Sequence, residues 1–208
     1  MNQQNPPKGE ASGSNELLDK QFAQALCYAW ELHCHQRRKL AEVPFFAHLM
    51  SVAGLVLDYG GNQQEAIAAL LHDAAEDQGG LERLEEIRQR FGDQVAAIVK
   101  GCTDSFQQPK PPWRERKEQF LCRLAEASDS VRLVCAADKI HNLRSLIRAY
   151  RAHGETIWSA FRGGREGTLW YYRTVLEVLQ KGRPLPILQE LADLWDQLHR
   201  LVAQENHR

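Results

Sequence analysis

The sequence lacks the features of a secreted, membrane-bound or nucleic-acid-binding protein. Its formal net charge is −1 over 208 residues, so no overall charge favours nucleic acid or an anionic membrane. No apolar run approaches the ~20 residues needed to span a bilayer. The N-terminus has no basic segment followed by an apolar one, so we expect no secretory signal. We therefore expect neither a membrane nor a nucleic-acid partner.

Cysteine is scarce and unpaired in the sequence. The chain has five cysteines, an odd number, and no two of them form a CxxC pair. This pattern argues against a disulfide framework and against a structural zinc site. It is typical of reduced thiols, which predicts a cytoplasmic protein. The five are Cys27, Cys34, Cys102, Cys122 and Cys135.

Strand-like alternation and long-period repeats are also missing, and the apolar spacing is helical throughout. We predict an all-α bundle of about eight to ten helices in one domain, residues 15–208, with a core at about 20–153 and extra C-terminal helices at about 155–204. Residues 1–14 are rich in Asn, Gln, Pro, Gly and Ser and are predicted to be disordered. The predicted helices are 16–38, 47–59, 62–77, 81–90, 93–100, 113–127, 130–153, 157–161, 166–180 and one ending near 202, with a loop at 103–112 and a cap at Asp129.

One predicted helix carries a cluster of polar residues. Asn62 and Glu65 have the spacing of a capping box at its start, and Gly79-Gly80 predicts its end. The apolar residues follow i, i+3, i+4, i+7 spacing and predict an amphipathic helix. The residues on the opposite face have the chemistry of metal ligands or of acids and bases: His72, Asp73, Glu76 and Asp77.

This acidic cluster needs a positive partner. Glu76 and Asp77 fall in the last helical turn, where the dipole disfavours each anion by about 0.3–1 kcal/mol. No Lys or Arg occurs between Glu65 and Arg83. The partner is then either a distant arginine or a divalent cation. Adjacent His and Asp favour the cation, because both are good ligands for Mn, Fe or Zn.

Three further positions outside this helix are candidates for the same site. His48 lies in the first turn of its predicted helix and is either a packed histidine or a ligand. Asp138 continues an apolar stripe, where a carboxylate is costly unless it is paired or bound to a metal. The run Gln36-Arg37-Arg38-Lys39 either complements a helix dipole or binds an anion.

The ordered set His48, His72-Asp73, Asp138 resembles the HD-domain metal-dependent phosphohydrolases. Within about residues 20–150 the motifs are similar to those of the RelA/SpoT hydrolase domain. They are Gln36-Arg-Arg-Lys…Pro44-Phe-Phe-Ala-His48, Leu71-His-Asp-Ala-Ala-Glu-Asp77, Phe91-Gly-Asp-Gln-Val with Gly101-Cys-Thr, and Ala137-Asp-Lys-Ile-His-Asn-Leu-Arg144. At 208 residues we expect no synthetase half, as in the small single-domain alarmone hydrolases. The segment 163–172 matches none of these motifs.

The resemblance implies a role for each matched residue. His48, His72, Asp73 and Asp138 would hold a divalent metal, with manganese the usual ion of the family. Glu76 and Asp77 would position and activate the attacking water. Arg38 and Lys39 would contact the nucleotide or its phosphates, and Asn142 and Ser145 would help to bind the base or sugar. Three positions depart from the family pattern, and none is a ligand: Phe45, Leu49 and Gln78.

The implied activity is hydrolysis of guanosine 3′,5′-bis(diphosphate), ppGpp, or of pppGpp. It would release pyrophosphate from the 3′ position and turn over the alarmone of the stringent response. Two alternatives remain open at the level of the sequence. One is an HD phosphohydrolase acting on a nucleoside monophosphate, a cyclic nucleotide, an adenosine-based alarmone or NADPH; the other is a nucleotide sensor without catalysis. In each case the partner is a small nucleotide, and both a monomer and a homo-oligomer are compatible with the sequence.

Overall fold

The protein is all-α, as predicted, throughout residues 17–107 and 109–205, which our computed structural model describes. Within these ranges the only β-type pairing is an isolated antiparallel bridge between Arg37 and Pro44. The segment 1–14, predicted to be disordered, lies outside the described residues. None of the described helices is both long and apolar enough to cross a membrane.

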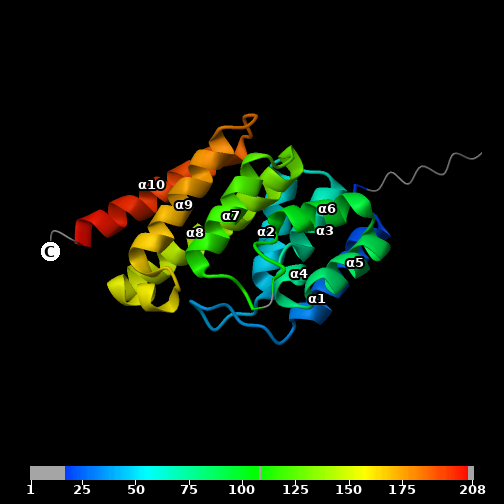
Figure 1. Cartoon of the computed structure of the whole chain (residues 1–208), viewed down its shortest axis with the longest axis horizontal. Helices are drawn as coiled ribbons and strands as arrows, with labels where there is room; N and C mark the ends of the chain where they lie inside the picture. Colours follow the sequence, from blue (N-terminus) through cyan, green and yellow to red (C-terminus); the bar gives the residue numbers. More distant parts are fainter. Residues whose placement is uncertain (1–16, 108, 206–208) are drawn as a thin grey trace, which may run out of the picture.

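The helices follow one another along the chain, and the two longest connections between them are 34–45 and 103–112 (Figure 1). Most of their bounds agree with the predicted ranges to within a few residues. They are α1 (Lys20–His33), α2 (Phe46–Asp58), α3 (Gln63–Leu71), α4 (Ala74–Asp77), α5 (Gly80–Phe91), α6 (Asp93–Cys102), α7 (Trp113–Ala125), α8 (Asp129–His153), the 3₁₀ helix η1 (Gly154–Ala160), α9 (Gly164–Gln180) and α10 (Ile187–Glu205).

The core forms where α2 packs against α3 and α8. Leu49, Val52 and Val56 of α2 are fully buried, as are the five residues 66–70 of α3. A helix buried on several sides must be apolar around most of its circumference, which explains the run of alanines and leucines there. This rigid centre carries the first turn of α2, the end of α3 and the middle of α8.

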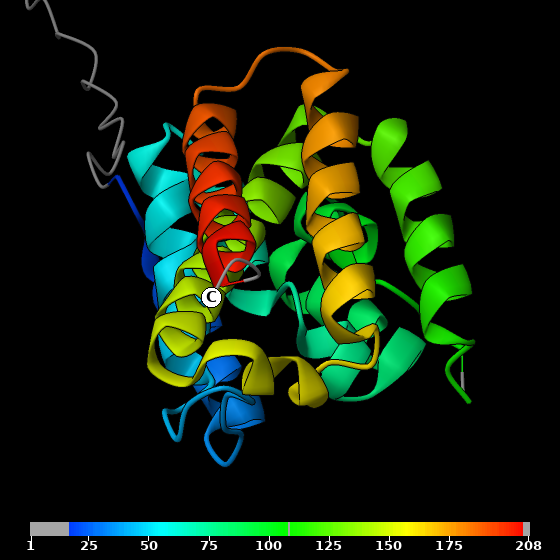
Figure 2. The same ribbon diagram turned by 90° about the vertical axis from the view of Figure 1, so that its left-hand side faces the viewer.

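The C-terminal helices extend the core on the far side of α8. Helices α9 and α10 lie side by side and both pack on α8 (Figures 1 and 2). Arg132, which is 4% exposed, donates to the Leu179 carbonyl (2.5 Å) and to the Arg183 carbonyl (2.7 Å). Tyr59 donates to Glu190 at 2.7 Å and joins α2 to α10. These bonds fix α9 beside α8.

The first helix is shorter than predicted. It ends at His33, so the prediction that Gln36–Lys39 forms a helix C-terminal turn is wrong. The segment instead folds back on itself: the Phe45 N–H donates to the Gln36 carbonyl at 2.8 Å, and the Arg38 N–H donates to Val43 at 3.1 Å. These hydrogen bonds pair backbone groups of the run outside any helix. Its cations therefore do not lie in the last turn of α1 and do not complement the dipole of that helix.

The polar helix is also interrupted. The capping box of Asn62 and Glu65 is present as predicted, but α3 stops at Leu71 and α4 restarts at Ala74. The cause is visible at His72, whose Nδ1 bonds to the Ala69 carbonyl at 2.7 Å. In an uninterrupted helix that carbonyl would pair with the Asp73 amide. His72 and Asp73 therefore lie in a turn between helices, and the prediction of one continuous helix is wrong.

Two smaller predictions are corrected further along the chain. The cap of α8 is Ser128, whose side chain accepts from the Val131 N–H, and not Asp129. Asp129 is the first helical residue and pairs with Arg132 at 2.7 Å, so its carboxylate is already engaged. The short helix predicted at 157–161 is a 3₁₀ helix over Gly154–Ala160.

Candidate active site and metal centre

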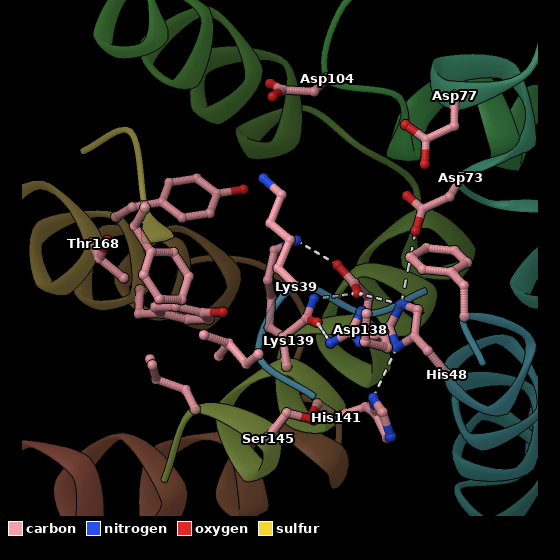
Figure 3. A pocket seen from close by; sticks show the side chains of 18 of the residues that line it. Lys39, His48, Asp73, Asp77, Asp104, Asp138, Lys139, His141, Ser145 and Thr168 are labelled. Carbon is pink, nitrogen blue, oxygen red and sulfur yellow. Dashed lines mark hydrogen bonds and ion pairs between the residues drawn. The ribbon is translucent and has the colours of Figure 1, made fainter. Parts of the chain in front are cut away.

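The four predicted metal ligands converge from three parts of the fold, and Figure 3 labels His48, Asp73 and Asp138 among them. His48 comes from α2, His72 and Asp73 from the turn between α3 and α4, and Asp138 from α8. The Nε2 atom of His48 lies 3.2 Å from Asp138 Oδ1 and 3.7 Å from Asp73 Oδ2. The Nε2 atom of His72 lies 3.2 Å from Asp73 and 3.7 Å from Asp138. Ligand atoms of the two histidines and Asp138 all lie within 4.8 Å of one another.

Neighbouring groups orient both imidazoles toward this centre. His72 Nδ1 faces the Ala69 carbonyl, which can only accept, so Nδ1 carries a proton and Nε2 is the ring nitrogen that faces the centre. His48 Nδ1 lies 2.8 Å from Nδ1 of His141. Burial, together with His48 and Arg38, lowers the pKa of His141 to about 4, so its neutral ring can accept the proton of His48 Nδ1.

The donor set fits a divalent cation. The Nε2 atoms of His48 and His72 are buried and have no hydrogen-bond partner among the described residues. Two inward nitrogen lone pairs and two carboxylates, with the outer nitrogens hydrogen-bonded, are the ligands and supports that Mn, Fe or Zn sites use. Two orphaned buried nitrogens would be costly without a cation between them.

Both carboxylates of the centre are held in the ionised form. Burial alone raises their pKa values, but His72 and His48 lower the pKa of Asp73 below its ordinary range. For Asp138 the Lys139 ammonium is the strongest opposing influence, and it pairs directly with the carboxylate. A cation would therefore meet two charged carboxylates at neutral pH.

Two of the predicted substrate-binding residues form a chain that begins at the metal centre. Asn142 donates through Nδ2 to Asp138 Oδ1 at 2.5 Å, and its carbonyl accepts from Arg38 at 2.6 Å. The Arg38 guanidinium also lies 5.7 Å from the centre of the Phe45 ring. The amide of Asn142 thus has a fixed orientation, and Arg38 is held at the wall of the site.

The acidic pair after the ligands divides into two different environments. Glu76 accepts from Lys110 at 2.9 Å and from the Asp104 N–H at 3.1 Å, with Arg116 at 3.7 Å. The positive partner expected from elsewhere in the fold is therefore present for Glu76, and it includes a distant arginine. Asp77 instead accepts from the neutral amide of Gln36 at 2.9 Å.

The environment of Asp77 raises its pKa. Burial and the negative charge of Asp73 raise it, and the Gln36 hydrogen bond only partly opposes them. A carboxylate with a raised pKa is a better proton acceptor near neutral pH than one whose pKa is lowered, as those of Asp73 and Asp138 are.

A cavity of about 1110 Å³ opens beside the centre and is large enough for a nucleotide with several phosphates. The predicted residues Lys39 and Ser145 line it, and Ser145 donates to the His141 carbonyl at 3.0 Å. Further cations that sequence reasoning missed also line it: Lys110, Arg116, Lys117, Lys139, Arg148 and Arg162.

Some missed residues left a usable signal in the sequence. Lys139 and His141 belong to the Ala137–Arg144 motif, where only the aspartate, the asparagine and Ser145 just beyond were given roles. Lys110 lies in the loop predicted at 103–112. The aromatic wall of the cavity gave no signal, because Tyr171 and Tyr172 are the last two residues of the unmatched segment 163–172.

Comparison with known proteins assigns the fold to a family. The family model described as HD domain matches residues 25–169. The chain belongs to the HD-domain family. Among solved structures, this HD domain resembles a metazoan ortholog of SpoT, described as hydrolysing ppGpp, with a TM-score of 0.72 and 27% identity over 86% of this chain and 96% of that one. It also resembles a Listeria monocytogenes protein, with a TM-score of 0.66 and 28% identity over 74% and 99%.

Curated relatives of this HD domain carry a common name. The human guanosine-3′,5′-bis(diphosphate) 3′-pyrophosphohydrolase MESH1 is 33% identical over 80% of this chain and 97% of its own length. A probable enzyme of the same name from Synechocystis is 38% identical over 60% of this chain. The match spans only 16% of that much longer protein.

Proposed function

We propose that this HD domain is a metal-dependent 3′-pyrophosphohydrolase of guanosine 3′,5′-bis(diphosphate), acting on ppGpp and pppGpp in alarmone turnover. The observation that carries the proposal is the convergence of His48, His72, Asp73 and Asp138 at the wall of a cation-lined cavity. The activity for which human MESH1 is named supports the same substrate, and the match covers 97% of that protein's length.

We propose that these four residues hold the divalent cation and that the cation is Mn²⁺. The proposal for the ion rests on the resemblance, because the ligand types also suit iron and zinc. When bound, the cation supplies Lewis acidity for the phosphoryl oxygens and a source of hydroxide near neutral pH. The five free thiols of the structure are consistent with our placing the enzyme in the cytoplasm.

The side chains around the centre divide the remaining work. Asp77 accepts the proton of the attacking water as the water oxygen bonds to the α-phosphorus of the 3′-diphosphate. The bond between that phosphorus and the 3′ oxygen breaks, and the 3′ oxygen takes up a proton and leaves as the 3′ hydroxyl. The products are pyrophosphate and GDP or GTP. Glu76 positions the water. It also positions the loop that carries Lys110, since its two oxygens accept hydrogen bonds from that lysine and from the Asp104 N–H.

Four further residues that line the cavity bind the substrate. Arg38 and Lys39 bind phosphate oxygens by charge-assisted hydrogen bonds, which stabilise the charge that develops there. Asn142 and Ser145 contact the base or the sugar; the Asn142 amide is already oriented by Asp138 and Arg38.

A substrate panel tests this function. The purified chain, loaded with Mn²⁺, is incubated with ppGpp, pppGpp, GMP, a 3′,5′-cyclic nucleotide, an adenosine-based alarmone and NADPH, and both pyrophosphate and orthophosphate are measured. We expect pyrophosphate from the two guanosine alarmones and little release from the others. Asp138→Asn is the inactive control. Orthophosphate from NADPH or a monophosphate, without pyrophosphate from ppGpp, would refute the proposal, and binding without release would indicate a sensor.

A further inference from the structure

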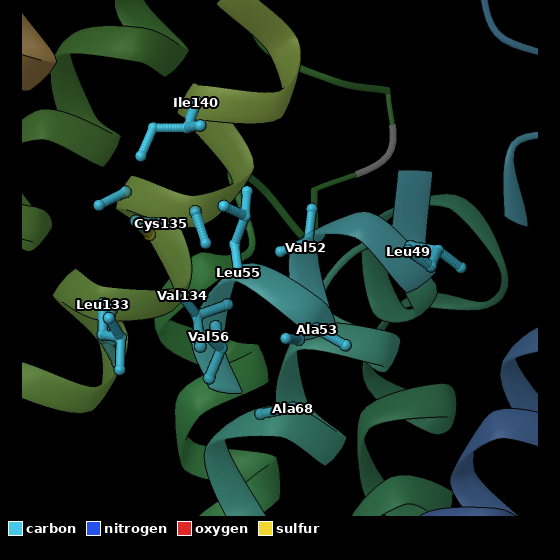
Figure 4. Close-up of a cluster of buried hydrophobic side chains, with 14 of the residues drawn as sticks. Leu49, Val52, Ala53, Leu55, Val56, Ala68, Leu133, Val134, Cys135 and Ile140 are labelled. Carbon is cyan, nitrogen blue, oxygen red and sulfur yellow. The ribbon is translucent and has the colours of Figure 1, made fainter. Parts of the chain in front are cut away.

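Two cysteine thiols lie in contact at the edge of the cavity. Cys102 is the last residue of α6, Cys135 lies in α8, and their sulfur atoms are 3.6 Å apart. Cys135 is 3% exposed and sits on the face of α8 that meets the buried apolar cluster (Figure 4), while Cys102 is half-buried. Both residues line the cavity, so a small molecule in the cavity can reach the pair.

Backbone packing holds this pair together. A Cβ atom added to Gly101 would lie 2.6 Å from Val131 Cγ2, so α6 meets α8 at a contact that only glycine permits. The two cysteines therefore face each other from rigid helices. A disulfide bond is about 2.05 Å long, so the sulfur atoms must approach by roughly 1.5 Å, through side-chain torsions together with a small movement of α6 against α8.

The environment also favours reaction at one of the two sulfurs. A hydrogen bond of 3.6 Å joins the Cys135 and Cys102 sulfurs, and the contact with Cys102, aided by Lys139, lowers the pKa of Cys135 against the effect of burial. The thiolate is the reactive form of cysteine. The other cysteines, Cys27, Cys34 and Cys122, are exposed, and none contacts a second thiol within the described chain.

We propose that Cys102 and Cys135 are a redox modification site. A peroxide that enters the cavity oxidises the two thiols to a reversible disulfide bond between them. The Cys135 thiolate attacks one peroxide oxygen; the O–O bond breaks and the other oxygen leaves as water. The Cys102 sulfur then displaces the oxygen of the resulting sulfenic acid as a second water. Two thiols thus lose two electrons and two protons, and one hydrogen peroxide becomes two waters.

The position of the pair couples this modification to the active site. Cys135 lies one helical turn before Asp138, and Cys102 is followed by the segment whose Asp104 N–H binds Glu76. Drawing the sulfurs together shifts these two walls relative to each other. We expect the disulfide to lower the rate of hydrolysis roughly 10- to 100-fold, as displacements near 1 Å do in active sites. This expectation rests on the proposed function.

Peptide mapping tests the modification itself. The full metal-loaded chain, at low concentration, is treated with hydrogen peroxide, alkylated and digested, and its cross-linked peptides are identified by mass spectrometry. We expect a Cys102–Cys135 cross-link that dithiothreitol removes and that Cys102→Ser abolishes, while the matched control Cys122→Ser retains it. Cross-links confined to Cys27, Cys34 or Cys122, or sulfonic acid at Cys135 without a cross-link, would overturn the proposal.

Rate measurements on the same samples test the coupling. Oxidised wild type should lose activity and recover it with dithiothreitol, whereas Cys102→Ser should keep its rate under oxidant. Metal content measured in parallel shows whether the loss is accompanied by release of the ion. A cross-linked protein with an unchanged rate would refute the coupling. A chain without hydrolase activity would refute the proposed function, and the mapping would still decide the disulfide.

Discussion

Replacing Asp77 by Asn tests which carboxylate accepts the proton. The substitution keeps the size of the side chain and removes its basicity. Asp77 is the carboxylate whose pKa is raised, and it has a neutral partner in Gln36 at 2.9 Å. Because the hydrogen bond of Asp77 goes to Gln36 and not to any of the four proposed ligands, metal binding should persist. We expect kcat to fall roughly 10²–10⁴-fold, the range of general acid–base groups.

That loss corresponds to about 2.7–5.4 kcal/mol in the activation free energy. The assay is pyrophosphate release from ppGpp under saturating Mn²⁺, with metal content by elemental analysis and nucleotide affinity by calorimetry. The matched control is Glu82→Gln, which removes a negative charge from the exposed first turn of α5 and should leave kcat unchanged. An Asp77→Asn protein with full kcat, or one that loses its metal in proportion to its rate, would refute the assignment of Asp77 as the base.

Three further substitutions address the ligands, the pH dependence and the substrate contacts. Asp138→Ala should abolish both bound metal and turnover in a folded protein, and full metal content by elemental analysis would contradict its assignment as a ligand. Gln36→Leu removes the hydrogen bond that lowers the pKa of Asp77. Because the base works deprotonated, the acidic limb of the kcat/KM profile should move to higher pH. An unmoved limb would count against Asp77 as the base. Arg38→Ala should raise KM roughly 10- to 100-fold, since a charge-assisted bond contributes about 1.5–3 kcal/mol, and a lower Tm with unchanged KM would mean a structural role.

The sequence predicted those parts of the fold that depend on local patterns. The capping box of Asn62 and Glu65 uses only residues three apart, and its spacing was sufficient to place the start of α3. The break at His72 escaped prediction because apolar periodicity carries no information on a side chain that bonds its own backbone. The end of α1 at His33 was missed for a similar reason, since the bonds of the next segment reach forward to Val43 and Phe45.

Long-range partners were the other limit of the sequence. The charges of Glu76 and Asp77 required a positive group, but only the folded chain brings Lys110 and Arg116 to Glu76, more than thirty residues away in the sequence. The contact of Cys102 with Cys135 has the same character. The four proposed metal ligands were an exception, because the resemblance named His48, His72, Asp73 and Asp138 together, and the fold brings these side chains into contact.

The distribution of charge supports the proposal that Arg38 and Lys39 bind an anion and do not serve as counter-charges for Glu76 and Asp77. If Arg38 and Lys39 were counter-charges, they would pair with the acids at the end of α4. Glu76 instead takes Lys110, and Asp77 takes the neutral amide of Gln36.

Several other cations of the cavity are already engaged with acids. Asp104 pairs with both Arg116 and Lys117, and Asp138 pairs with Lys139. Arg38, by contrast, donates to a neutral amide oxygen of Asn142, and neither Arg38 nor Lys39 has an ion pair among the described residues. Their charge is therefore available to a ligand, and a nucleotide with phosphates at both its 3′ and 5′ positions brings the anionic groups that would use it.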